Sequence, residues 1–165
     1  MNSTVQKLVE RLVGKPCTQK RLGRPRSLSL GFGELVPDKK SQQTGIVYAE
    51  WEVRTYYWAW RVVKGGRVLC GSQEIVDSID ELRQALNRID LGGFSSLRQV
   101  GDMDVRVELD NGYAVDFLAT ISDENECFHI FCPESICIVF SPAGGWQTGP
   151  SDRPWTSDNR DAQRG

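Results

Sequence analysis

The sequence has only one histidine among its 165 residues, and none of its apolar runs approaches the ~20 residues that a membrane-spanning helix needs. Its first residues also lack the apolar centre of a secretory signal peptide. A net charge of -2 gives no general case for nucleic-acid binding. These absences predict a cytoplasmic protein that binds neither membranes nor nucleic acids. In that compartment the five cysteines are expected to be reduced thiols.

Sequence motifs for catalysis and cofactor binding are also missing. No phosphate-binding Walker sequence and no nucleophile-elbow sequence is present. The run Gly31-Phe32-Gly33 lacks the third glycine and the helix start of a dinucleotide site. Glu50 and Glu52 share one strand face, where solvent exposure is a simpler explanation than catalysis. The sequence therefore predicts no catalytic residue and no cofactor.

Four potential zinc ligands fall within eleven residues: Cys127, His129, Cys132 and Cys137. They lack a Cys-x-x-Cys spacing, and strand alternation places Cys127 and His129 on the face opposite Cys132. Small buried strand residues are the commoner role for such cysteines, so no metal site is predicted. A reversible disulfide between Cys132 and Cys137 is conceivable, but the reducing cytoplasm argues against it.

The strongest structural pattern is the alternation of apolar and polar residues over residues 105–121, around Asp110-Asn111-Gly112. A two-residue turn would mix polar and apolar groups on both faces of this hairpin. A three-residue loop gives Gly112 the left-handed position and creates one wholly apolar face. That face consists of Val105, Val107, Leu109, Tyr113, Val115 and Phe117. Arg106, Glu108 and Asp116 then face solvent, with Arg106 opposite Asp116.

Two segments have helical spacing of apolar residues, at 3–13 and 78–90. Both begin with a capping-box pattern, Ser3 with Gln6 and Ser78 with Glu81. The basic stretch at residues 15–26 is interrupted by prolines and glycine, and it predicts a loop.

Strand-type patterns account for most of the remaining chain. They predict strands at residues 27–32, 46–71, 97–100, 127–132 and 136–140, with an exposed turn at 37–45. Within residues 46–71 the parity changes near Arg54-Thr55, which requires a bulge or a break. Lys64-Gly65-Gly66-Arg67 predicts a turn in the same segment. The resulting prediction is one α+β domain over residues 1–148, an antiparallel sheet of consecutive hairpins packed with one or two helices, and a poorly ordered tail at 149–165.

The charge and the aromatic residues are unevenly distributed. The first 26 residues contain seven basic side chains and one acidic side chain, so the rest of the chain is acidic. An acidic body suggests a basic partner, although a solvated surface is the commoner explanation. The aromatic run at residues 56–60 cannot face one core entirely, because neighbours on a strand point to opposite sides. Packing is the commoner role, but Tyr57 and Trp58 are also candidate interface anchors.

Several of these residues carry a resemblance that covers residues 27–146. They are Leu28-Ser29-Leu30-Gly31-Phe32-Gly33, Trp58-Ala59-Trp60-Arg61-Val62-Val63, Val68-Leu69-Cys70-Gly71-Ser72, the hairpin with its Asn-Gly turn, and Phe128-His129-Ile130-Phe131. With them the chain resembles small uncharacterised bacterial α+β proteins, some of which resemble immunity proteins of polymorphic toxin systems. The resemblance implies a fold and a toxin-like protein partner, and it implies no catalytic site.

The leading functional prediction is a non-catalytic cytoplasmic interaction protein, of the immunity type, that neutralises a partner by binding it. The predicted contact residues are Tyr57, Trp58, Arg106, Glu108, Asp116, Asp123, Glu124 and Glu126. One alternative is a small-ligand or regulatory binding module with a pocket between sheet and helix, into which Arg61 or Tyr57 points. The second alternative is an enzyme of unrecognised type that uses His129 or paired carboxylates. The oligomeric state is left open.

Overall fold

The structure is a computed structural model, and it describes residues 1–37, 47–123 and 126–152. Within these residues the chain forms two antiparallel sheets, with six strands in the first and five in the second. In spatial order the first sheet is β1 (Cys17–Leu22), β2 (Leu28–Pro37), β3 (Val47–Arg54), β9 (Phe128–Cys132), β10 (Ile136–Ser141) and β11 (Gly145–Pro150). The second sheet is β5 (Arg67–Gly71), β4 (Ala59–Lys64), β8 (Tyr113–Leu118), β7 (Asp104–Leu109) and β6 (Phe94–Val100).

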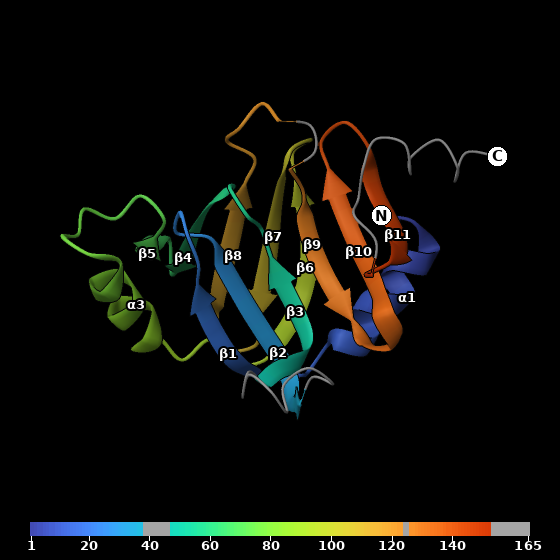
Figure 1. The fold of residues 1–165 in the computed structure, drawn as a ribbon, viewed down its shortest axis with the longest axis horizontal. Coiled ribbons are helices and arrows are strands. Elements are labelled where there is room, and N and C mark those ends of the chain that lie inside the picture. The colour runs from blue at the N-terminus through green and yellow to red at the C-terminus, as the bar shows by residue number, and fades with distance from the viewer. Residues whose placement is uncertain (38–46, 124–125, 153–165) are drawn as a thin grey trace.

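The two sheets lie face to face, and the core lies between them (Figure 1). Phe117 of the second sheet meets Phe128 of the first with ring centroids 5.2 Å apart, and both side chains are fully buried. The sequence correctly predicted an α+β protein with antiparallel hairpins. It did not predict that the hairpins divide into two sheets, so the apolar face of each sheet is covered mainly by the other sheet.

The two helices lie at the open sides of this sandwich (Figure 1). Helix α1 (Ser3–Leu12) contacts β11 and β6, and helix α3 (Ile79–Asn87) contacts β1 and β5. Both were predicted, but the cap of α1 is Asn2, whose side chain accepts from the Val5 amide at 3.0 Å. Ser78 caps α3 as expected. In the described part of the chain, neither helix has the length and apolarity to cross a membrane.

Strand β1 corrects the prediction of a loop at residues 15–26. Its basic side chains all find acceptors on neighbouring elements, which the sequence pattern does not reveal. Lys20 Nζ donates to the carbonyl oxygens of Leu86, Asn87 and Ile89 at 3.2, 3.3 and 2.5 Å. A cation is favourable there because the last carbonyl groups of α3 have no partner within the helix. The turn residues of the stretch form the β1–β2 connection, where the Gly23 amide donates to Ser27.

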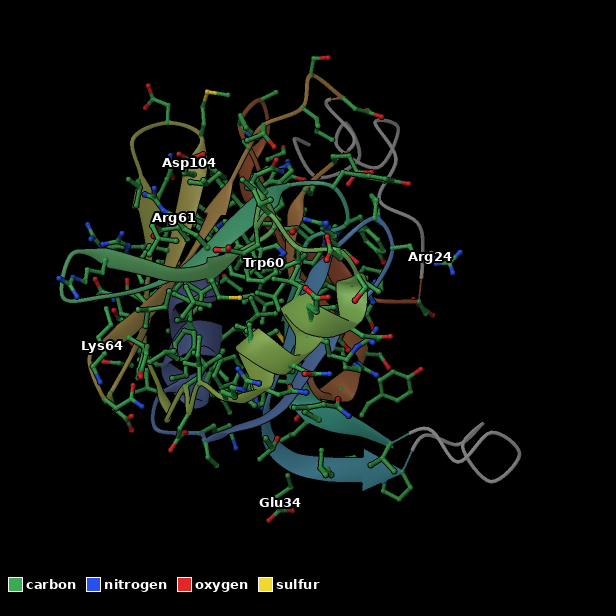
Figure 2. The ribbon with its side chains drawn as sticks, turned by 90° about the vertical axis from the view of Figure 1, so that its left-hand side faces the viewer. Arg24, Glu34, Trp60, Arg61, Lys64 and Asp104 are labelled. Atoms are coloured by element: carbon green, nitrogen blue, oxygen red, sulfur yellow. The ribbon has the colours of Figure 1, made fainter. Side chains whose placement is uncertain are left out.

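The predicted break near Arg54-Thr55 is the point where the chain leaves one sheet for the other. Strand β3 ends at Arg54, and β4 begins at Ala59 in the second sheet. This crossing explains the change of parity, because Trp51 faces the core from the first sheet and Trp60 faces it from the second. Figure 2 shows Trp60 in the interior, with Arg61 and Lys64 toward the outside.

The central hairpin has the register expected for a three-residue loop. Val105 pairs with Phe117, Arg106 with Asp116 and Val107 with Val115. Gly112 has a φ of +83°, which suits glycine. Of the predicted core face, Tyr113 is half-buried and the other five side chains are buried. Asp116 faces outward, yet it is only 4% exposed, so its predicted exposure to solvent is wrong.

The last strands extend beyond the predicted final hairpin. The hairpin of β9 and β10 is confirmed, with Pro133–Ser135 as its turn. Strand β11 was not predicted, and it includes Gly149 and Pro150, which the sequence assigned to the tail. Trp146 holds this strand against the core, with its ring 4.8 Å from that of Phe140. The predicted tail lies outside the described residues from residue 153 onward. The same holds for nearly all of the predicted turn at residues 37–45.

Candidate functional site

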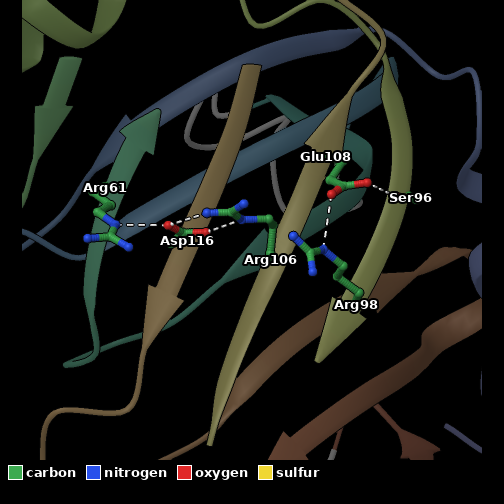
Figure 3. Close-up of polar contacts among 6 residues, drawn as sticks. All are labelled: Arg61, Ser96, Arg98, Arg106, Glu108 and Asp116. Carbon is green, nitrogen blue, oxygen red and sulfur yellow. Dashed lines mark hydrogen bonds and ion pairs between the residues drawn. The ribbon is translucent and has the colours of Figure 1, made fainter. Parts of the chain in front are cut away.

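The outer face of the second sheet carries an ordered set of charged side chains. Because strand residues alternate, the neighbours of the core residues in β4, β8, β7 and β6 point away from the first sheet. These outward residues include Arg61, Ser96, Arg98, Arg106, Glu108 and Asp116 (Figure 3). The helices pack at the sheet edges, and the side chains of Arg61 and Arg98 are 45% and 53% exposed. The face is therefore open to a binding partner.

Asp116 lies between two arginines from the neighbouring strands. Arg61 Nε donates to Asp116 Oδ2 at 2.8 Å, while Arg106 donates through Nε at 2.5 Å and through Nη2 at 2.9 Å (Figure 3). Burial alone raises the pKa of Asp116, but the hydrogen bonds from the two arginines outweigh it, and the pKa falls below its usual 3.8. The carboxylate is therefore ionised at neutral pH.

Glu108 forms the second charged group on this face. Its carboxylate accepts from Ser96 Oγ at 2.7 Å and from Arg98 Nε at 3.0 Å. The hydrogen bond from Ser96 is the main reason why the pKa of Glu108 is lowered from 4.5, and Arg98 adds to the effect. Asp116 and Glu108 thus both already accept hydrogen bonds from side chains of this chain.

A hollow of about 510 Å³ opens over these residues beside the β4–β5 hairpin. Its lining includes Arg61, Arg106 and Lys64 as cations and Glu108 as an anion. Lys64 Nζ lies 4.0 Å from the centre of the Tyr113 ring, which holds the ammonium group at the rim. The cations outnumber the anions here, and the arginines have N–H groups beyond those that bind Asp116. The hollow therefore suits a partner that presents hydrogen-bond acceptors or negative charge.

The predicted contact residues do not all gather at this place. Arg106, Glu108 and Asp116 come together on the outer face. Tyr57 is 56% exposed in the connection between β3 and β4, whereas Trp58 is only 2% exposed. The prediction of Trp58 as an interface anchor is therefore wrong, because its ring packs edge-on against Phe140 in the core.

The acidic residues predicted to make contacts lie in the connection that precedes β9. Asp123 and Glu126 are described there, and Glu124 lies outside the described residues. The pKa of Glu126 is raised mainly because the side chain is partly buried, and the negative charge of Asp123 raises it further. These residues lie outside β4, β8, β7 and β6, the strands that form the charged face.

The residues of the site that the contact prediction missed are Arg61, Lys64, Ser96 and Arg98. Arg61 lies between the core residues Trp60 and Val62, so alternation alone indicates its outward direction. What the sequence does not reveal is the pairing of β4 with β8, which sets Arg61 opposite Asp116. The alternative with Arg61 or Tyr57 pointing into a pocket between sheet and helix is not supported, since both are directed outward and exposed.

His129 lies on the outer face of the first sheet, away from the charged site. Its ring stacks 5.7 Å from Phe131 and meets the edge of Tyr56 at 5.8 Å. Cys127 and Cys137 are buried on the same face in a small cluster, and Cys132 belongs to the main core as alternation predicted. Cys132 pairs with Ile136 rather than with Cys137, and the structure shows no disulfide among the cysteines, all of which lie in its described part. Among the described residues no three His, Cys, Asp or Glu side chains are grouped for metal binding.

Comparisons of the chain with protein-family models, with curated proteins and with solved structures found no match. The resemblance to immunity-type proteins stays a prediction.

Asp116→Asn is expected to lower the free energy of unfolding at pH 7 by about 1.5–3 kcal/mol, because hydrogen bonds to a charged group are replaced by bonds to a neutral amide. Because folding lowers its pKa, ionised Asp116 stabilises the protein above pH 3.8, and this contribution is lost as pH falls through the folded-state pKa. The difference between variant and parent should therefore shrink in acid. Urea unfolding at pH 7 and pH 3 measures it.

Asp80→Asn is the matched control, since the Asp80 side chain is 72% exposed and pairs with Arg83 on the same helix. Its expected effect is below about 0.5 kcal/mol. Equal effects of the two substitutions would contradict the structural role of Asp116.

Proposed function

We propose that this protein is a non-catalytic interaction protein, of the immunity type, which neutralises a partner protein by binding it through the outer face of the second sheet. The observation that carries the proposal is the open, charged face with its hollow over Arg61, Arg106 and Lys64. The face is broad, and its functional side chains come from four adjacent strands of a rigid sheet.

The internal ion pairs prepare this face for binding. Arg61 and Arg106 are held by Asp116, and Arg98 is held by Glu108, so these long side chains lose less conformational entropy when a partner arrives. Arginine is also enriched among the residues that dominate binding energy at protein interfaces. Val63 and Val68 line the same hollow, and Val68 is 55% exposed, which adds apolar area beside the charges.

The chemistry of the face favours an acidic contact surface on the partner. The carboxylates of Asp116 and Glu108 already accept hydrogen bonds from arginines, while the guanidinium groups keep donors for carboxylates of another protein. This proposal differs from the basic partner that the overall charge of the chain suggested. Local pairing of charges decides which groups remain available, whereas net charge does not.

Co-expression with the product of the adjacent gene tests the proposal. We expect rescue of growth and a complex on size-exclusion chromatography. Arg61→Ala is expected to weaken the complex at least about tenfold, the scale of an interface arginine. Arg83→Ala on α3 is the matched control, because Arg83 is an exposed arginine on another surface.

A chain that neither rescues growth nor forms a complex would contradict the proposed function. Equal binding by Arg61→Ala and the parent would show that another surface makes the contact. Circular dichroism of each variant establishes that the fold is retained, so a loss of binding is not a loss of structure.

A further inference from the structure

A separate pocket of about 280 Å³ lies on the outer side of the first sheet, across β1, β2 and β3. Its polar lining includes Arg21, Ser29, Glu52, Arg54 and Thr55. Tyr48 adds an aromatic wall. This pocket is on the sheet opposite the charged face, so it does not depend on the function proposed above.

Glu52 is the central charge of this pocket. Ser29 Oγ donates to Glu52 Oε1 at 2.6 Å, Arg54 Nη1 donates to the same oxygen at 3.4 Å, and Arg21 Nη2 donates to Oε2 at 3.0 Å. Glu52 is only 8% exposed, although the strand pattern predicted an exposed position. Two guanidinium groups therefore share one carboxylate, which leaves one positive charge in excess.

Two aromatic rings hold the arginines in place. The Arg21 guanidinium lies 4.8 Å from the centre of the Tyr48 ring, and that of Arg54 lies 4.3 Å from the centre of the Tyr56 ring. Such stacking fixes the planes of the guanidinium groups while leaving several N–H donors for other acceptors. Both arginine side chains remain about one-third exposed, at 33% and 29%.

Two residues of the lining carry buried polar atoms without a hydrogen-bond partner in the described part of the chain. These atoms are Thr55 Oγ1 and Arg54 Nε, and Thr55 is fully buried. Unsatisfied buried donors are rare in native proteins because each loses its hydration without compensation. A ligand that brings acceptors into the pocket supplies the missing partners.

We propose that this pocket binds a small organic anion, whose carboxylate or phosphate group lies between Arg21 and Arg54 and accepts from Thr55. The apolar part of the ligand lies against Tyr48, whose side chain is exposed at the pocket. The volume is at the lower end of the range for ligand pockets, which fits a small molecule better than a peptide. Because Arg54 Nε and Thr55 Oγ1 are both shielded from solvent in this structure, the anion reaches them when the Arg54 side chain leaves its stacking position on the Tyr56 ring.

Nuclear magnetic resonance of the arginine Nε–Hε groups tests this proposal in the full chain. The probes are benzoate, phenyl phosphate and inorganic phosphate, with benzyl alcohol as the neutral comparison. We expect saturable chemical-shift changes at the Nε–Hε groups of Arg21 and Arg54 as an anion is added. The Nε–Hε groups of Arg61 and Arg106 already bind Asp116, so they should respond only at anion concentrations at least tenfold higher. The tighter of the two aromatic anions identifies the preferred charged group, whereas a response to inorganic phosphate alone would overturn the placement of an organic group against Tyr48.

Two variants separate binding from folding. Arg21→Gln is expected to weaken binding at least tenfold, and Thr55→Val, which keeps the shape of the side chain, is expected to weaken it severalfold. Arg83→Gln on α3 should bind like the parent. If Thr55→Val fails to fold, the exposed Arg21 still provides the test. The proposal is overturned by the absence of saturable shifts with all three anions, by equal shifts at Arg61 and Arg106, or by unchanged affinity in Arg21→Gln.

Discussion

Phe117→Ala is expected to lower the free energy of unfolding by about 3–5 kcal/mol, the usual cost of removing a buried phenylalanine ring. Phe117 is fully buried on β8, the middle strand of the second sheet. Its ring meets Phe128 of the first sheet at 5.2 Å, so the substitution leaves a cavity at the contact between the two sheets. Both sheets are fixed by many other residues, and neither can move in to fill the space without breaking its own packing.

Urea unfolding measures this effect, and Leu118→Ala is the matched control. Leu118 is the next residue on the same strand, and it is partly exposed because it points away from the core. Its truncation should cost less than about 1 kcal/mol. Similar losses at the two positions would show that the two sheets do not share the core described here.

The free energy of unfolding is also expected to fall as the pH falls from 6.5 toward 4, because of His129. Burial, together with a smaller contribution from the nearby charge of Arg54, lowers the pKa of His129 from 6.5 to about 4. In this pH window the unfolded chain binds the proton and the folded chain does not, so acid favours unfolding. This difference in pKa between the folded and unfolded chain lowers the free energy of unfolding by about 3 kcal/mol from pH 6.5 to pH 4.

The single histidine makes this measurement direct, since its Cε1–H resonance belongs to one residue. We expect the resonance of the folded protein to titrate near pH 4. His129→Phe keeps the stacking on Phe131 and removes the titrating group, so its stability should change much less between pH 6.5 and 4. The raised pKa of Glu126 acts with the opposite sign, and it is common to both proteins. A folded-state titration near pH 6.5 would contradict the burial of His129.

Local patterns in the sequence predicted the elements whose partners are adjacent in the chain. The hairpin of β7 and β8 was predicted with its register, because alternation and Gly112 both favour a three-residue loop. The helix at Ser78 followed from its cap and apolar stripe. The polar strand β1 was not predicted, because its stability depends on partners such as the end of α3 and Glu52, which are distant in the sequence.

The candidate site was predicted in part for the same reason. Arg106, Glu108 and Asp116 lie on the predicted outer face of one hairpin, so alternation placed them together. Arg61 joins them only through the pairing of β4 with β8, and no local pattern specifies that pairing. Trp58 was misplaced because the chain crosses between sheets just before it, and strand alternation does not continue across such a crossing.

The assembly of the first sheet has a consequence for the rate of folding. Its centre is the pairing of β3 with β9, in which Glu52 lies opposite Phe131, whereas the whole second sheet is formed by the chain between them. Closing so long a loop is entropically costly, and proteins dominated by such distant contacts fold slowly. Until β9 arrives, one edge of β3 has no strand beside it, and unpaired edges promote association between chains. The second sheet, whose β6–β7 and β7–β8 hairpins are local, is the part of the molecule suited to form first and to bring β9 to β3.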